Sequence, residues 1–103
     1  MKTLVLGGRT PARVREVLAT LREDGFAAEG VSTDEEARGL LASGEFGVLI
    51  VGGGVGPESR AAMKEFAAGH GVREVIDGAL TEPFDVYVRR EFEPLIRKAS
   101  GED

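Results

Sequence analysis

The sequence predicts an α/β fold in which a small parallel sheet lies between layers of helices. Short apolar runs rich in β-branched residues, such as Val48–Val51, are typical of strands that are buried on both faces. Glycines follow the two clearest of these runs, and after each run comes a stretch with apolar residues at helical spacing. Strands that alternate with helices favour a parallel sheet with right-handed crossovers.

The first unit combines a strand at Lys2–Leu6 with a turn at Gly7-Gly8. Thr10 is a suitable N-cap, and Pro11 fits the first helical position because its missing N–H has no partner there in any case. Gly25 is the expected end of this helix. Its core stripe is Val14, Val17, Leu18 and Leu21.

The second unit is weaker. The segment Phe26–Val31 contains poor strand formers, so we expect an edge strand. Two capping-box spacings, Thr33 with Glu36 and Ser32 with Glu35, start its helix. The helix buries Ala37, Leu40 and Leu41 and ends at Gly44.

The third unit has the strongest strand, Val48–Val51, followed by the glycine-rich turn Gly52–Gly56. Pro57 starts a helix that ends at Gly69–Gly71. Its expected core side is Ala62, Met63, Phe66 and Ala67.

The fourth unit contains a partly solvated strand, with Val75 and Ile76, that ends at Asp77-Gly78. After Pro83 comes a helical stripe in which Pro94 predicts a break. The stripe is Phe84, Val88, Phe92, Leu95, Ile96 and Ala99. A short fifth strand at Phe84–Val88 is the competing interpretation, because these residues also alternate with period two.

Together the units predict a single α/β domain over residues 1–103, with four strands, or five if the alternative holds. The first and third strands are the most apolar, which favours the order 2-1-3-4 of a three-layer, flavodoxin-like or Rossmann-like sheet.

Composition excludes several classes of function. The 103 residues carry a net charge of −5, which argues against non-specific nucleic-acid binding. The chain has no cysteine and one histidine, which excludes thiolate chemistry and multi-histidine metal sites. The apolar runs are too short to cross a membrane. Gly7, Gly8 and Arg9 interrupt the first of them too early for a signal peptide, so we expect a cytoplasmic protein.

A ligand site is expected where the strand order reverses, at the carboxyl ends of the first and third strands. Both glycine clusters, Gly7-Gly8 and Gly52-Gly53-Gly54, fall there. Glycine allows positive φ and close approach of a ligand to the backbone. Tight turns between strands and helices also need glycine, so each cluster alone is explained without a ligand.

The first loop has the features of an anion site. Arg9 precedes Thr10, and Arg13 lies in the first helical turn, where a cation opposes the helix dipole by about 0.3–1 kcal/mol. A bound phosphate or carboxylate would reverse that penalty. The alternative is that both arginines face solvent or pair with an acid of the second helix. In the other loop Glu58 would repel an anion, which Ser59 and Arg60 offset.

Catalytic patterns are sparse. Asp77, with Glu82 nearby, would face the crevice and could serve in acid–base or Mg²⁺ chemistry, although Asp-Gly is also a common turn pair. His70 falls at the opposite end of its helix. The glycine turns match neither the phosphate-binding P-loop nor the dinucleotide fingerprint. We therefore expect no enzyme and name no cofactor.

The stretch Gly78–Asp85, with its Pro83-Phe84 pair, resembles the end of a response-regulator receiver domain. Lys2–Gly8 and Val48–Val51 also suit that fold. The phosphorylation chemistry does not carry over: Gly7-Gly8 replace the acidic pair, Gly52 stands near the phospho-acceptor position, and Glu82 replaces the lysine. The resemblance implies a degenerate receiver that pairs with itself or with a partner protein.

Two functions follow from the sequence. The first is a non-catalytic binding or regulatory module for a phosphate-containing small molecule. The second is a receiver-like interaction domain that forms a homodimer or binds a protein.

Overall fold

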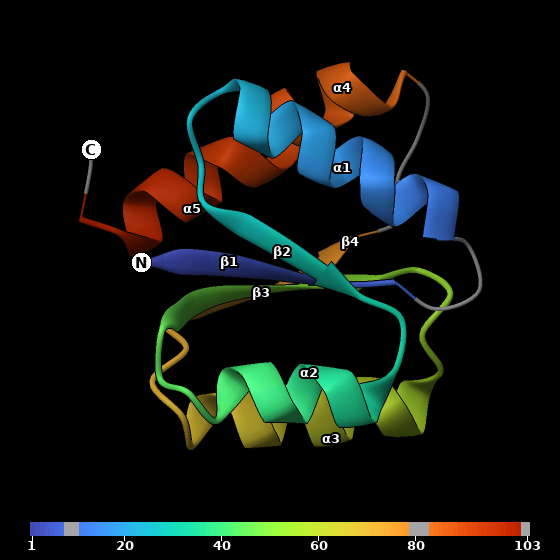
Figure 1. Ribbon diagram of the computed structural model, residues 1–103, viewed down its shortest axis with the longest axis vertical. Coiled ribbons are helices and arrows are strands. Elements are labelled where there is room, and N and C mark those ends of the chain that lie inside the picture. Colours follow the sequence, from blue (N-terminus) through green and yellow to red (C-terminus); the bar gives the residue numbers. More distant parts are fainter. Residues whose placement is uncertain (8–10, 79–82, 102–103) are drawn as a thin grey trace.

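The computed structural model describes residues 1–7, 11–78 and 83–101, which form a sheet with helices on both faces (Figure 1). The strands are β1 (Lys2–Leu6), β2 (Ala28–Val31), β3 (Phe46–Gly52) and β4 (Glu74–Gly78). The helices are α1 (Pro11–Glu23), α2 (Asp34–Leu41), α3 (Pro57–Ala68), α4 (Phe84–Tyr87), the π-helical segment η1 (Val88–Phe92) and α5 (Glu93–Ala99).

The four strands are parallel and run in the order β2-β1-β3-β4, which confirms the predicted topology. The two central strands pair in register, with Leu4 opposite Leu49 and Leu6 opposite Val51. These four side chains are at most 1% exposed. Strands buried on both faces need the continuous apolar runs that the sequence shows here.

Successive side chains of each central strand point to opposite faces and so supply two separate cores. Val5, Val48 and Ile50 pack against α1, η1 and α5. Leu4, Leu49 and Val51 pack against α2 and α3. Figure 1 shows the first group of helices on one side of the sheet and the second group on the other.

The predicted helix stripes are largely confirmed. All four apolar positions of α1 are buried, and so are Ala37 and Leu41 of α2 and Met63 and Ala67 of α3. Leu40, Ala62 and Phe66, which were also expected in the core, are only half-buried. Thr33 is the N-cap of α2: its hydroxyl accepts a hydrogen bond from the Glu36 backbone N–H at 3.2 Å, as its capping-box spacing predicts. The expected N-cap of α1, Thr10, lies outside the described residues.

The segment after β4 is helical, so the alternative of a fifth strand at residues 84–88 is wrong. The predicted break occurs where Pro94 removes a backbone donor: η1 widens the helix, and the Glu93 N–H donates to the Val88 carbonyl five residues back. This wider turn rotates the following residues. Phe92 and Ile96 therefore stay in the core, while Leu95, which was expected there, is 37% exposed.

We expect Phe92→Ala to lower the free energy of unfolding by about 3–5 kcal/mol, because Phe92 is buried between the sheet and α1 and its loss leaves a cavity. Leu95→Ala is the matched control and should cost about 1 kcal/mol or less. Urea denaturation measures both. Equal losses would contradict the rotation of the helix at η1.

Candidate functional site

The carboxyl ends of β1 and β3 lie side by side at the switch point of the sheet. From there the chain leaves β1 for α1 and β2 on one side, and leaves β3 for α3 and β4 on the other. Gly7 and Gly52 meet at this edge: a Cβ on Gly52 would lie 3.1 Å from the Leu6 carbonyl oxygen and 3.6 Å from the Gly7 Cα. The structure therefore brings together the glycines that sequence spacing placed in one crevice.

Close packing explains why these two positions are glycine. A Cβ on Gly7 would collide with the Val14 side chain of α1, and one on Gly52 would press on the neighbouring strand. Among the described glycines, the left-handed φ values belong to turns that follow helices, at Gly25, Gly44, Gly71 and Gly101. The expectation that the crevice glycines use positive φ is thus not met at Gly7 or Gly52.

The loop between β3 and α3 exposes its backbone. Gly53 and Gly54 are exposed, Ser59 is half-buried, and the Val55 N–H closes the turn by donating to the Gly52 carbonyl at 3.1 Å. Gly56 is the N-cap of α3 and supplies no side-chain hydrogen bond to the first turn. This loop therefore presents exposed backbone to solvent and no cluster of polar side chains.

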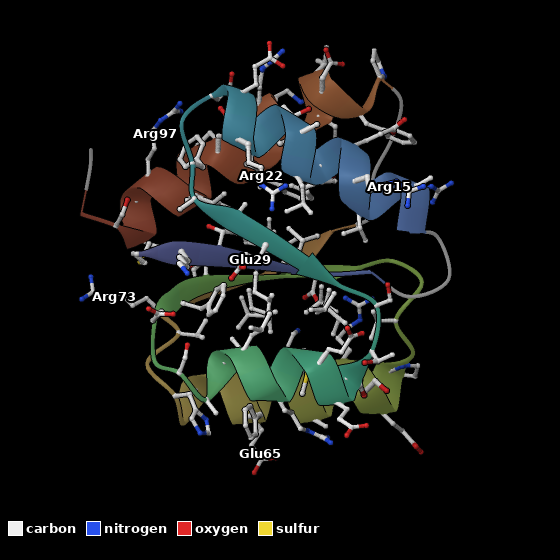
Figure 2. The ribbon with its side chains drawn as sticks, viewed as in Figure 1. Arg15, Arg22, Glu29, Glu65, Arg73 and Arg97 are labelled. Carbon is white, nitrogen blue, oxygen red and sulfur yellow. The ribbon has the colours of Figure 1, made fainter. Side chains whose placement is uncertain are left out.

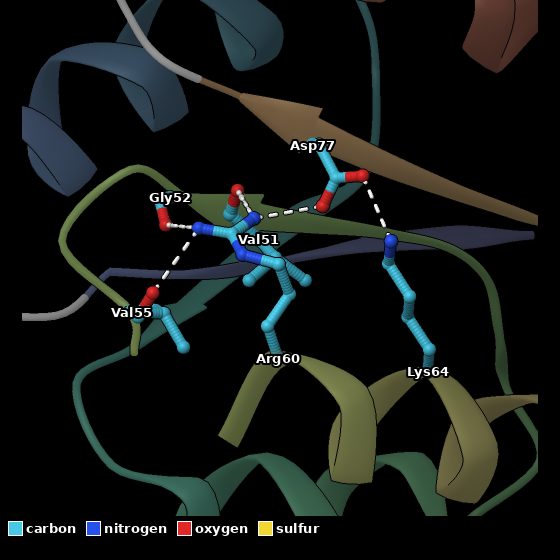
Figure 3. A network of polar contacts seen from close by, with 6 residues as sticks. All are labelled: Val51, Gly52, Val55, Arg60, Lys64 and Asp77. Atoms are coloured by element: carbon cyan, nitrogen blue, oxygen red, sulfur yellow. Dashed lines mark hydrogen bonds and ion pairs between the residues drawn. The ribbon is translucent and has the colours of Figure 1, made fainter. Parts of the chain in front are cut away.

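Arg60 ties the ends of β3 and β4 together (Figure 3). Its guanidinium donates to the carbonyls of Gly52 at 2.9 Å and Val55 at 3.2 Å, with a longer contact to Val51 at 3.4 Å. It also donates to Asp77 Oδ1 at 2.7 Å, while the Lys64 ammonium donates to Asp77 Oδ2 at 2.8 Å. One turn of α3 thus places two cations on the carboxylate that ends β4.

These contacts decide the chemistry of Asp77. Hydrogen bonds from Lys64 and then Arg60 lower the pKa of Asp77 below its usual value, so the carboxyl stays ionised at neutral pH. Both oxygens already accept a charged donor, which disfavours a role as proton donor or Mg²⁺ ligand. Glu82, its expected neighbour, lies outside the described residues. Two cations on one carboxylate leave one positive charge unbalanced within this trio, and Glu58 adds a negative charge in the first turn of the same helix.

On the α1 side the structure describes only part of the expected anion loop. Gly8, Arg9 and Thr10 lie outside the described residues. Arg13 is exposed and its guanidinium lies 5.7 Å from the centre of the Phe84 ring, so it stacks against α4. The first turn of α1 carries no acidic residue. The start of α1 is therefore positively charged, as the sequence indicated, and the charge of Arg13 lies on the side of this helix that faces α4.

His70 lies away from this edge, as expected. Its ring stacks on Phe66, and Nδ1 donates to the Phe66 carbonyl at 2.8 Å at the end of α3. The described part of the chain has no cluster of three metal-binding side chains. None of its helices is long and apolar enough to span a membrane.

The contribution of Arg60 and Lys64 was underrated from sequence. The sequence pattern indicated Arg60 only as an offset, with Ser59, to the charge of Glu58, and it indicated no role for Lys64. Their spacing of four residues places them on one face of α3, which was a readable signal. Their partner Asp77 lies 17 and 13 residues further along the chain.

No protein-family model, curated protein or solved structure matches the chain. The function must therefore be argued from the site itself.

We expect Arg60→Ala to lower the free energy of unfolding by about 1–3 kcal/mol, because three backbone carbonyls lose a partly buried donor. Lys64→Ala removes an exposed ion pair with the same carboxylate and should cost about 1 kcal/mol or less. Thermal and urea denaturation of both variants would measure the difference. A Lys64→Ala loss as large as that of Arg60→Ala would show that charge alone matters here.

Proposed function

We propose that the protein is a non-catalytic binding module that takes a phosphate-containing small molecule at the carboxyl edge of its sheet. The observation that carries the proposal is the pair Arg60 and Lys64 on the single carboxylate of Asp77. The unbalanced positive charge of this trio stands at the carboxyl edge of the sheet, where parallel sheets of this order bind their ligands.

The physical case rests on donors that converge on the same edge. The Lys64 side chain is 43% exposed, and its ammonium uses one hydrogen bond on Asp77, so it retains donors for an anion. The exposed backbone at Gly53 and Gly54 lets a ligand approach closely. The contacts proposed on this basis are Gly7, Gly8, Arg9, Thr10, Arg13, Gly52, Gly53, Gly54, Ser59 and Lys64. Asp77 acts by holding the two cations.

An amide NMR titration at low salt tests the proposal, with phosphate, AMP, ATP, NAD and coenzyme A as probes and uncharged adenosine as the matched control. We expect saturable shifts at Gly7, Gly8, Arg9 and Gly52–Gly56 with the anionic probes only, because the donors recognise phosphate oxygens. Absence of shifts with every probe, or equal shifts with adenosine, would overturn the proposed site.

We expect Arg9→Ala or Lys64→Ala to weaken binding of the responding probe about tenfold or more, since each removes a charge-assisted hydrogen bond. Arg73→Ala is the control, because it makes the same charge change at the opposite end of the sheet; Figure 2 shows Arg73 and the α1 residue Arg15 at opposite ends. Similar losses in all three variants would mean that only the overall charge is sensed.

One observation favours a second function, a receiver-like interaction domain. The large apolar side chains Val86 of α4 and Leu95 of α5 are 48% and 37% exposed, and both lie in the helical segment that follows the receiver-like stretch Gly78–Asp85. Apolar side chains left in water favour association.

If this segment pairs two copies, light scattering should show a dimer that Val86→Asp or Leu95→Asp dissociates. A clean monomer at high micromolar concentration would count against this second function.

A further inference from the structure

Glu93 is a buried acid without a full set of partners. Its side chain is 4% exposed, and its Oε1 accepts a long hydrogen bond from Arg97 at 3.4 Å. Within the described residues Oε2 has no hydrogen-bond partner. Burying an ionised carboxylate that lacks hydrogen-bond partners costs free energy. A protonated carboxyl is neutral and can donate a hydrogen bond from its O–H, so its burial costs less.

The group that faces Glu93 is a second acid, Asp24, in the turn after α1. Asp24 is held by Arg89, whose Nε donates to its Oδ2 at 2.8 Å. The cations that act on Glu93 are Arg97 of α5 and Arg89 of η1. Glu23 of α1 and Asp85 of α4 contact Arg89, at 3.9 and 3.6 Å, and Arg22 of α1 donates to the Ala28 carbonyl.

The pKa values of the two acids are shifted in opposite directions. Burial first, and then the neighbouring Asp24 carboxyl, raise the pKa of Glu93 to about 7, while Arg97 and Arg89 oppose that rise. The pKa of Asp24 is lowered, first by Arg89 and then by the neighbouring Glu93 carboxyl. These opposite shifts favour Glu93 as the acid that holds a proton and Asp24 as the acid that can accept a hydrogen bond from it.

The helix is also irregular at Glu93. Glu93 stands where η1 gives way to α5, next to Pro94, which has no N–H to donate. A pocket of about 400 Å³ adjoins this point and is lined by Asp24, Phe26, Ile96 and Arg97, among others. It exposes the Asp24 side of this contact to solvent.

We propose that Glu93 and Asp24 form a proton-dependent latch that fastens the turn after α1 to the C-terminal helical segment. With Glu93 protonated, its O–H bonds to Asp24 and the latch is closed. When Glu93 ionises, its buried carboxylate lies beside the negative charge of Asp24, and the segment from Glu93 to Ser100 loosens towards the pocket. The latch operates whether or not a ligand occupies the carboxyl edge.

The sign follows from the direction of the shift. An acid whose pKa is higher in the closed state than in the open state stabilises the closed state at low pH, and this contribution is lost as pH rises through 7. If the open form titrates near the ordinary value of 4.5, the opening equilibrium should rise about tenfold between pH 6 and pH 8.

Amide hydrogen exchange tests the latch. Opening constants, corrected for the intrinsic pH dependence of exchange, should rise about tenfold from pH 6 to pH 8 at Asp24, Phe26 and Ser100, and not in α3. Glu93→Gln should abolish this rise, because glutamine donates to Asp24 at every pH. Glu91→Gln, an exposed neighbour with the same change of charge, should keep it.

Direct titration of the Glu93 carboxyl carbon by NMR keeps the test decisive if a variant fails to fold. We expect a midpoint near 7 in the wild type and a lower midpoint in Asp24→Asn. A wild-type midpoint near the ordinary value, or an unchanged pH dependence of exchange in Glu93→Gln, would overturn the proposal.

Discussion

The pairing of β1 with β3 is the contact on which the rest of the molecule depends. Both strands are buried on both faces, so each contributes side chains to two cores at once. That demand explains the continuous apolar runs at the centre of the sheet and the weaker patterns of its edges. It also sets the place where the strand order reverses, because the chain leaves β1 and β3 towards opposite sides of the sheet.

Packing around that pair also explains features that first suggest a ligand. Gly7 lies against Val14, and Gly52 lies against the backbone of the adjacent strand. Glycine at these positions is required by the fold whether or not a ligand binds. The proposed binding site therefore depends on charge and not on the glycines. Arg60 and Lys64 carry two positive charges against the one negative charge of Asp77.

Periodicity predicted the architecture well because burial repeats along each element. The strand Val48–Val51, the stripe of α1 and the cap at Thr33 were all readable locally. The polar contacts could not be predicted from local patterns, because their partners lie far apart in the sequence. Arg89 and Asp24, for example, are 65 residues apart. Such pairs depend on how two helices pack together, which local sequence patterns do not encode. The exposure of Leu95 was also unpredicted, because it depends on the rotation of the helix at η1.

The guanidinium of Arg60 has one further consequence. It grips the carbonyls at both ends of the turn, Gly52 and Val55, and leaves Gly53 and Gly54 between them exposed. The residues that anchor the turn are thereby different from the residues that it exposes. New side chains at Gly53 and Gly54, from sequence drift or loop grafting, would change this surface while the strand ends stay fastened.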